Sequence, residues 1–338
     1  MITHEDSLKD FSSQIKFSIE NYSGHGLLAD DLDVILLGGL GGSGIAAAIA
    51  KNWFFTKANR PIETVNDYHL PAYVSSKSLV VLNSYSGNTE ETLSLYKEAK
   101  EKGCKIIVLS SGGRITDLAE QDGIKTYPLM AGFQPRQSIG LGLTFMFLIL
   151  GELFGMDLTS ELTEVGEKLD QNQDRLIDSA AKISTFVSSS VQNKYVIITD
   201  REMHAVGVRF ANQIQENAKL EAFVHVVPEC NHNVIESYID RLNSNFFLIY
   251  TEENVRIGSR FEFLTGHLEM ENNKVFPMLV PEYSIYSIYN IIYRLDWVSV
   301  MIANQIHADL MHVPTITSLK EYLESIEEIE DFTEEDEG

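Results

Sequence analysis

The feature of this sequence that most restricts its fold is a unit that occurs three times in the first half. Each unit has a short apolar run, a loop rich in Gly, Ser or Asn, and then a helical pattern. The apolar runs are Val34–Leu37, Leu79–Leu82 and Cys104–Leu109. Such units are typical of a parallel sheet whose strands are buried by helices on both faces. The sequence therefore predicts an α/β fold.

The second half repeats this pattern without repeating the residues. A chain of 338 residues favours two domains, and we expect 1–155 and 156–338, joined near Leu153–Glu161. Helical periodicity covers 162–188. Further strands are predicted at 195–199, 223–227, 246–250 and 275–280, and helices at 43–55, 89–102, 203–219, 284–310 and 318–329.

The charge of the chain excludes one class of partner. The formal net charge is −23, and removing the nine acidic residues of Glu324–Gly338 would still leave −14. Such a field repels nucleic acid. It also repels an anionic substrate unless the site supplies backbone N–H groups, hydroxyls and a few cations. We expect the acidic segment from about residue 324 to be a frayed, solvated tail.

Cysteine usage and hydropathy suggest a cytoplasmic protein without a membrane partner. Two cysteines, Cys104 and Cys230, are too few for a disulfide framework, and Met1–Asp6 does not resemble the start of a signal peptide. The most apolar run, Ile139–Leu150, is too short to span a bilayer and is interpreted as a buried helix.

The first glycine-rich loop is consistent with two kinds of ligand site. Residues Gly39, Gly41 and Gly44 form a GxGxxG pattern between a strand and a helix, as in dinucleotide sites, and Glu63 lies where a ribose-binding acid would follow. Ser43, at the start of the helix, can cap that helix or contact a ligand.

The second loop favours phosphate over a dinucleotide. Ser84, Ser86 and Thr89 lie at a strand-to-helix turn, where hydroxyls and free N–H groups suit a phosphate monoester. A dinucleotide fold does not need this cluster, although N-capping of the helix alone would also explain Thr89. The third loop, Ser110–Gly113, adds hydroxyls at the same edge of the sheet.

Together these loops resemble a sugar isomerase (SIS) domain. The longer pattern is similar to the bifunctional phosphoglucose/phosphomannose isomerase family of bacteria and archaea. The further matching segments are Gln134–Ser138, Gln215–Lys219, Pro228–Ile235 and Leu319–Lys320.

The resemblance implies two SIS-type domains, each a flavodoxin-like or Rossmann-like parallel sheet flanked by helices. It implies a homodimer with active sites at the subunit interface. The implied reaction interconverts glucose 6-phosphate or mannose 6-phosphate with fructose 6-phosphate through a cis-enediol(ate), without a metal or organic cofactor. The phosphate would be bound by Gly42, Ser43, Ser84, Ser86 and Thr89.

The resemblance also implies roles for four residues. Glu216 would be the base that moves a proton between C1 and C2. His232 would open the sugar ring from the partner subunit. Arg136 would stabilise the enediolate, and Lys320 would assist ring opening. Outside the motifs, such residues are ordinary: a surface Glu, a loop His, an Arg in a salt bridge at a helix start, and a surface Lys.

Other candidate groups are given structural interpretations. His225 and Cys230 are expected to be packing residues. His307 and His312 are five positions apart, the wrong spacing for one metal-binding face of a helix, and HExxH is absent, so we expect no metal.

Two departures from the family pattern leave the substrate range open. The chain has Gln215 where the family commonly has Asn, and Gly42–Ala46 reads Gly-Ser-Gly-Ile-Ala rather than Gly-Ser-Ala-Ile-Gly. One alternative is an isomerase of another sugar phosphate, such as a heptose. Another is a non-catalytic phosphosugar regulator, although Asp6–Tyr22 leaves little room for a DNA-binding domain.

Overall fold

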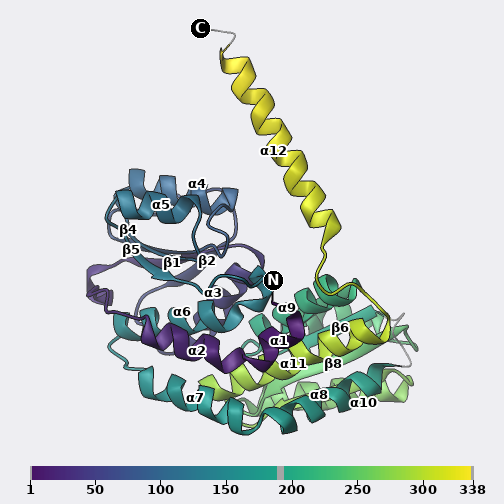
Figure 1. The fold of residues 1–338 in the computed structure, drawn as a ribbon. Helices are drawn as coiled ribbons and strands as arrows, with labels where there is room; N and C mark the ends of the chain where they lie inside the picture. The colour runs from purple at the N-terminus through teal and green to yellow at the C-terminus, as the bar shows by residue number, and fades with distance from the viewer. Residues whose placement is uncertain (1, 189–193, 336–338) are drawn as a thin grey trace.

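The structure, a computed structural model, describes residues 2–188 and 194–335 and contains two parallel sheets (Figure 1). This confirms the predicted α/β class. The first sheet has the order β2-β1-β3-β4-β5 and the second the order β7-β6-β8-β9. The strands are β1 (Val34–Gly38), β2 (Ile62–Val65), β3 (Ser78–Asn83), β4 (Lys105–Ser110), β5 (Lys125–Pro128), β6 (Lys194–Thr199), β7 (Ala222–Val226), β8 (Ser244–Thr251) and β9 (Lys274–Val280).

Helices cover both faces of the first sheet and fill the space between the sheets (Figure 1). The α-helices are α1 (His4–Lys9), α2 (Phe11–Glu20), α3 (Gly41–Phe54), α4 (Glu90–Glu101), α5 (Arg114–Gln121), α6 (Ile139–Leu153), α7 (Thr159–Gln171), α8 (Gln173–Ser188), α9 (His204–Gln213), α10 (Val255–Met270), α11 (Ile285–Gln305) and α12 (Pro314–Glu335). Shorter turns are η1 (Ala29–Asp31), η2 (Pro135–Gln137), η3 (Ile214–Ala218, a π-helical turn), η4 (Glu229–His232) and η5 (Val234–Ser237).

Burial on both faces explains why the central strands are apolar throughout. Leu36 and Val80 pack beneath α4 and α5, whereas Ile35 and Val81 face the larger core shared with α3 and α6. Alternate residues of a strand point to opposite faces, so both sets must be apolar. The apolar run at Ile139–Leu150 is the buried helix α6, as expected.

Three expected helices differ in detail from the structure. The periodic stretch 162–188 is two helices, α7 and α8, which meet at Asn172. The helix expected to end at Lys219 changes at Ile214 into the wider turn η3. The helix expected over 284–310 ends at Gln305, just before His307, which has a positive φ of 56°. The helical spacing of apolar residues continues across such breaks because the segments before and after each break bury residues on the same side.

Two strands were not expected from the sequence. β2 and β5 are the edge strands of the first sheet, and they carry polar residues such as Glu63 and Lys125. Edge strands are only partly covered by helices, so they lack the continuous apolar run by which central strands are recognised.

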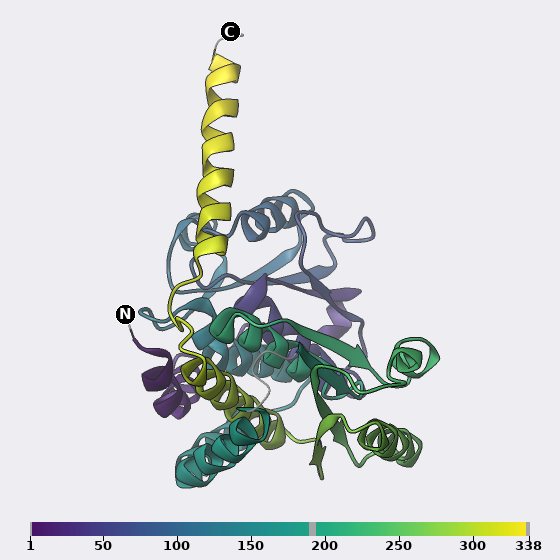
Figure 2. The ribbon, with the colours of Figure 1, turned by 90° about the vertical axis from the view of Figure 1, so that its right-hand side faces the viewer.

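The acidic C-terminal segment is helical as far as it is described. α12 begins at Pro314, four residues before the expected start, and continues to Glu335 instead of fraying from residue 324. Its Glu, Leu and Ile residues sustain a helix, and Pro is well tolerated at a first helical position. Figures 1 and 2 show α12 projecting away from the body of the protein. Residues 336–338 lie outside the described residues.

The strand order of the first sheet fixes where two of the predicted loops meet. After β1 the chain continues to β2, toward one edge of the sheet, and after β3 it continues to β4, toward the other edge. Accordingly α3 packs on one face of the sheet and α4 on the other. A crevice opens at such a reversal, beside the carboxyl ends of the strands. The loops containing Gly42 and Ser84–Thr89 lie at that crevice.

Gly42 lies against the turn that carries Arg136. A Cβ atom at Gly42 would be 2.7 Å from the carbonyl oxygen of Pro135 and 3.0 Å from Cα of Arg136. Only a residue without a side chain allows this approach of two main-chain segments. The glycine-rich loop and η2 are therefore packed as one unit.

We expect Gly42→Ala to lower the free energy of unfolding by about 1–3 kcal/mol, because the added methyl group must push η2 away. Urea unfolding would measure this. The matched control is Gly258→Ala in α10, where a Cβ would meet no atom within 4 Å; this change should stabilise the protein by up to about 1 kcal/mol. Equal effects of both substitutions would contradict the packing argument.

The N-terminal helix places a buried histidine behind the same turn. Thr3 caps α1 by accepting a hydrogen bond from the N–H of Asp6. His4 is 1% exposed, and among the described residues neither ring nitrogen has a hydrogen-bond partner. Burial, reinforced by the charges of Arg136 and Arg209, lowers the pKa of His4 to about 3.

This histidine should make stability depend on pH. The unfolded chain takes up a proton at His4 below about pH 6.5, whereas the folded protein does so only near pH 3. The free energy of unfolding must therefore fall as the pH decreases through this window. Between pH 7 and pH 5, wild type should lose about 2 kcal/mol more than His4→Phe.

Urea unfolding at both pH values measures the difference. His69 is exposed, and His69→Phe should retain most of the wild-type pH dependence. If the free energy of unfolding changed equally with pH in wild type and His4→Phe, His4 would be protonated to the same extent in the folded and the unfolded protein.

Candidate active site

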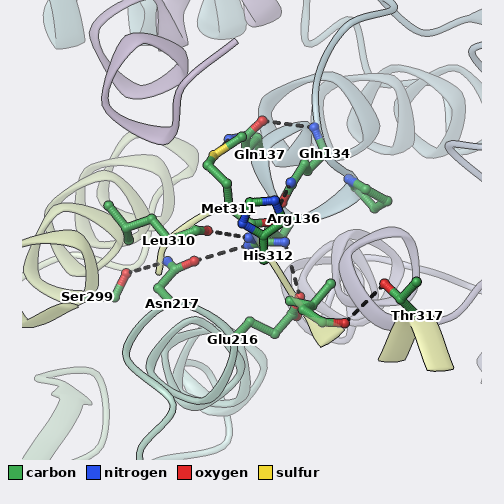
Figure 3. A network of polar contacts seen from close by, with 12 residues as sticks. Gln134, Arg136, Gln137, Glu216, Asn217, Ser299, Leu310, Met311, His312 and Thr317 are labelled. Carbon is green, nitrogen blue, oxygen red and sulfur yellow. Dashed lines mark hydrogen bonds and ion pairs between the residues drawn. The ribbon is translucent and has the colours of Figure 1, made fainter. Parts of the chain in front are cut away.

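Arg136 is the buried centre of a polar network that includes Glu216, Asn217 and Leu310 (Figure 3). It lies in η2, directly before α6, and is 4% exposed. Its Nε donates to Oδ1 of Asn217 at 3.0 Å, and its Nη2 donates to the carbonyl oxygen of Leu310 at 2.5 Å. Burial lowers the pKa of Arg136, opposed by the charge of Glu216. The guanidinium therefore has fixed partners.

Glu216 lies opposite Arg136, on the π-helical turn η3. Its Oε2 is 3.6 Å from Nη1 of Arg136, and its side chain is 27% exposed. The wider turn ends at Ala218 and is followed by Lys219, which has a positive φ of 59°. Turns of this kind in α-helices frequently mark functional sites. Two residues expected to act together from distant motifs are thus adjacent.

A segment that the sequence analysis did not assign to the site completes this network. The carbonyl oxygens of the three residues 310–312, here called the linker segment, each accept from a motif side chain. Arg136 binds that of Leu310, Gln134 binds that of Met311 at 2.7 Å, and Lys219 binds that of His312 at 2.9 Å. No residue type signals this contact, because the acceptors are main-chain atoms.

The hydroxyl-rich loops are tied to one another beside this network. Ser43 Oγ accepts from the N–H of Tyr85 at 3.2 Å, and Nδ2 of Asn83 donates to the carbonyl oxygen of Ser43 at 2.9 Å. Ser84 Oγ donates to Oγ1 of Thr89 at 3.1 Å. Ser43 lies in the first turn of α3, which begins at Gly41, so it is not the cap.

The first turn of α4 has no side-chain cap and carries Glu90 and Glu91. Thr89 is the N-cap residue, yet its side chain makes no capping hydrogen bond. Ser86 is exposed and its Oγ accepts from the N–H of Asn88 at 3.3 Å. Hydroxyls and unpaired N–H groups at a helix start form a ready site for phosphate. Gly42 joins this site to Arg136.

Two expected site residues are not brought to this network within one chain. His232 is exposed in η4, after the edge strand β7, and its side chain makes no hydrogen bond or ion pair with residues 2–188 or 194–335. Lys320 is exposed on α12. The structure therefore brings together Arg136, Glu216 and the hydroxyl loops, but not the other two.

Other candidates have local environments that suit packing. Cys230 is buried, which raises the pKa of its thiol to about 11, and His225 is half-buried in β7, which lowers its pKa. Glu63 accepts a hydrogen bond from Oη of Tyr73 at 2.5 Å. In the described part of the chain, no three His, Cys, Asp or Glu side chains converge on a possible metal position.

Both departures from the family pattern have local explanations. Nε2 of Gln215 donates to the carbonyl oxygen of Ala222 at 2.9 Å, so the longer side chain reaches β7. At Gly44, a Cβ would lie 2.4 Å from the carbonyl oxygen of Gly39 and 2.7 Å from Nδ2 of Asn66. The close approach of the loop to its own helix therefore excludes the alanine that the family commonly has there.

The arrangement suits proton transfer next to a carbonyl group. A partly exposed carboxylate can remove a proton from carbon, and an adjacent guanidinium stabilises the oxyanion that forms. The hydroxyl loops would hold a phosphate at the other end of the same molecule. None of the helices in the described ranges combines the length and apolar character needed to cross a membrane.

Solved structures share the fold. The C-terminal domain of glucosamine-fructose-6-phosphate aminotransferase from Francisella tularensis superposes with a TM-score of 0.72, covering 91% of this chain and 97% of that one, at 15% identity. Glucosamine-6-phosphate deaminase from Thermotoga maritima gives 0.69 at the same identity, covering 91% of this chain and 97% of that one. At this identity the likeness concerns the fold alone.

Other proteins share more sequence identity with this chain than these two structures do. Residues 31–120 match the SIS domain, and residues 178–323 match the bacterial phospho-glucose isomerase C-terminal SIS domain. The chain is 34% identical over 212 residues to a D-glucosamine-6-phosphate 4-epimerase of Sulfolobus acidocaldarius, covering 62% of this chain and 66% of that protein.

Two relatives cover nearly the whole chain. The bifunctional phosphoglucose/phosphomannose isomerase of Caldicellulosiruptor bescii is 32% identical over 319 residues, covering 89% of this chain and 92% of the relative. The enzyme of the same name from Aquifex aeolicus is 33% identical over 298 residues, covering 86% and 90%. The family resemblance predicted from the motifs is confirmed: this chain belongs to the family of bifunctional phosphoglucose/phosphomannose isomerases.

Proposed function

We propose that this protein interconverts glucose 6-phosphate, mannose 6-phosphate or both with fructose 6-phosphate. Family membership supports the reaction class. The observation that carries the proposal is the pair of Arg136 and Glu216, 3.6 Å apart and packed through Gly42 against the hydroxyl loops. Glu216 would be the base, Arg136 the cation, and the hydroxyl loops the phosphate site beside them.

The phosphate group would bind Ser43, Ser84, Ser86 and Thr89, with the main chain at Gly42. Hydroxyls and N–H groups supply this binding without adding charge. The strongly acidic protein thus accepts an anion through dipoles and one buried cation. The reacting end of the sugar would then reach toward Arg136.

Isomerisation needs one base and one stabilising cation. Glu216 removes the proton from C2 of the open-chain aldose, the C–H electrons form the C1=C2 bond, and O1 becomes negatively charged. Arg136 stabilises this enediolate. Glu216 returns the proton to C1, and the hydroxyl proton on O2 moves to O1, leaving the ketone at C2. Glu216 carries the proton between the two carbon atoms, and the proposal includes no metal or organic cofactor.

Ring opening is assigned to residues outside this pair. We place His232 in the site of a second copy of the chain, making the enzyme a homodimer with interface sites. Its exposed position in η4 and its lack of described side-chain partners support this. An imidazole exchanges protons near neutral pH, as opening a hemiacetal requires.

Lys320 is assigned an assisting role in the same step. It lies six residues after Pro314, where α12 begins, so it is about 9 Å along the helix axis. The linker segment just before α12 is held at Arg136 and Lys219. In the structure α12 projects away from the body of the protein, so the role assigned to Lys320 requires α12 to lie over the site during ring opening.

The proposal divides the work between two domains, residues 1–155 and 156–338, and places the reaction in the cytoplasm. The first domain would hold the phosphate and Arg136. The second would supply Glu216 and Lys320, and His232 for the other subunit.

We expect Glu216→Gln to lower kcat by on the order of 10³-fold or more, because the amide cannot accept the carbon-bound proton. Coupled assays with all three hexose phosphates would measure this. Glu221→Gln, at an exposed carboxylate paired with Lys194 at 3.3 Å, is the matched control and should be nearly as active as wild type.

Full activity of Glu216→Gln would remove Glu216 from its role as base. If wild type bound hexose phosphates without turning them over, a phosphosugar regulator would be favoured. Turnover of only another sugar phosphate would preserve the reaction class and change the substrate.

Mixing two inactive variants tests the shared site. In a dimer of Glu216→Gln with His232→Ala, one site would combine an intact Glu216 with an intact His232 of the other chain. Random mixing after dissociation should therefore restore about a quarter of wild-type activity, since half of the dimers would carry one intact site of two.

The unmixed variants, taken through the same dissociation step, are the controls. If both residues served the site of their own chain, mixing would restore nothing.

A further inference from the structure

We propose that Arg209 and Asn217 are positioning residues for Arg136, and that helix α11 holds both of them. The inference rests on the proposed function, because it concerns how Arg136 is oriented for catalysis. Neither residue is among those expected to touch the substrate. The pair of Arg136 and Glu216 is separated by 3.6 Å, longer than a hydrogen bond. The orientation of the guanidinium therefore depends on its other contacts.

Arg209 holds the main chain of Arg136. It lies on α9 and is 3% exposed, and its Nη2 donates to the carbonyl oxygen of Arg136 at 3.0 Å. The same nitrogen donates to Oδ2 of Asp296 on α11 at 2.5 Å. A buried cation without an anion is strongly destabilising, so Asp296 is what allows a charged donor at this depth.

Asn217 holds the side chain of Arg136. It is fully buried, and its Oδ1 accepts from Nε of Arg136 at 3.0 Å. Its Nδ2 donates to Oγ of Ser299 at 2.9 Å, and that hydroxyl donates to the carbonyl oxygen of Asp296 at 2.7 Å. Ser299 thereby fixes which end of the amide faces the guanidinium. Because Asn217 follows Glu216, the same contacts also hold the turn that carries the base.

The two sets of contacts originate from one face of one helix. Asp296 and Ser299 are three residues apart on α11, so their side chains are neighbours. Asp296 acts through Arg209 on the carbonyl group of Arg136. Ser299 acts through Asn217 on Nε of Arg136. A charge that is held in place stabilises a transition state without reorganising. The alternative is that these polar groups serve only the stability of the core.

Enzyme kinetics in two backgrounds separate these possibilities. We expect Arg209→Lys to lower kcat by about 10- to 100-fold with little change in KM, since the phosphate loops are untouched. When the protein already carries Arg136→Lys, adding Arg209→Lys should lower kcat further by about threefold or less, the size expected when two substitutions act through the same side chain and are not additive. Equal losses in both backgrounds would overturn the proposal.

Ser299 offers a smaller change that tests the other set of contacts. Ser299→Ala should lower kcat by about 10-fold, and Ser299→Thr, which keeps the hydroxyl, should recover most of it. The matched control is Arg294→Lys, a half-buried arginine on the same helix whose charged neighbour is Arg175. A folded Ser299→Ala variant with wild-type kcat would contradict the role of Asn217.

A measurement independent of turnover keeps this inference separate from the proposed function. In protein labelled with ¹⁵N-arginine, the Nε–H signal of Arg136 would be assigned by its loss in Arg136→Lys. We expect this proton to exchange slowly in wild type and Arg294→Lys, and at least about 10-fold faster in Ser299→Ala and Arg209→Lys, since opening becomes easier. Unchanged exchange would overturn the positioning role even if the enzyme is an isomerase, and faster exchange would support it even if the substrate differs.

Discussion

The buried guanidinium of Arg136 is the group on which the arrangement of this site depends. A permanent charge with 4% exposure is tolerated only when its donors are satisfied and an anion is close. Asn217, the carbonyl oxygen of Leu310 and the carboxylate of Glu216 meet this requirement. Glu216 and Asn217 are neighbours on η3, whereas Leu310 lies just before α12, so satisfying one cation draws two segments of the second half of the chain to the edge of the first sheet.

The sheet topology determines what that cation faces. Reversal of strand order between β1 and β3 creates a crevice lined by hydroxyls and by the start of α4. The second sheet repeats the order without a fifth strand, and its β6 is followed by the helix that carries Arg209 and leads to Glu216. In the proposed mechanism, phosphate binding would use the helix starts beside the first sheet, and proton transfer would use the turn that follows the first helix after β6.

The sequence predicted those parts of the site that follow from local rules. Hydroxyl loops after parallel strands must gather at one edge, so Ser43, Ser84 and Thr89 could be grouped in advance. The pairing of Arg136 with Glu216 came only from the family resemblance, because it depends on how two domains pack. The positioning of Arg136 by Arg209 and Asn217 was not foreseen, since an Arg and an Asn within a helix give no sign of the partners that they will meet.

The linker segment has a consequence for how such sites change over time. Its three contacts are accepted by the main chain of residues 310–312, while the donors are the side chains of Gln134, Arg136 and Lys219. Every amino acid, proline included, has a carbonyl oxygen. The donors are therefore constrained in identity, whereas the acceptors are constrained only in position. Substitutions here preserve these three contacts as long as the main chain keeps its position, although Leu310 also packs against the core and Sδ of Met311 accepts from Nε2 of Gln137 at 3.9 Å. Sequence variability in this stretch would therefore be a poor guide to the importance of its main-chain contacts.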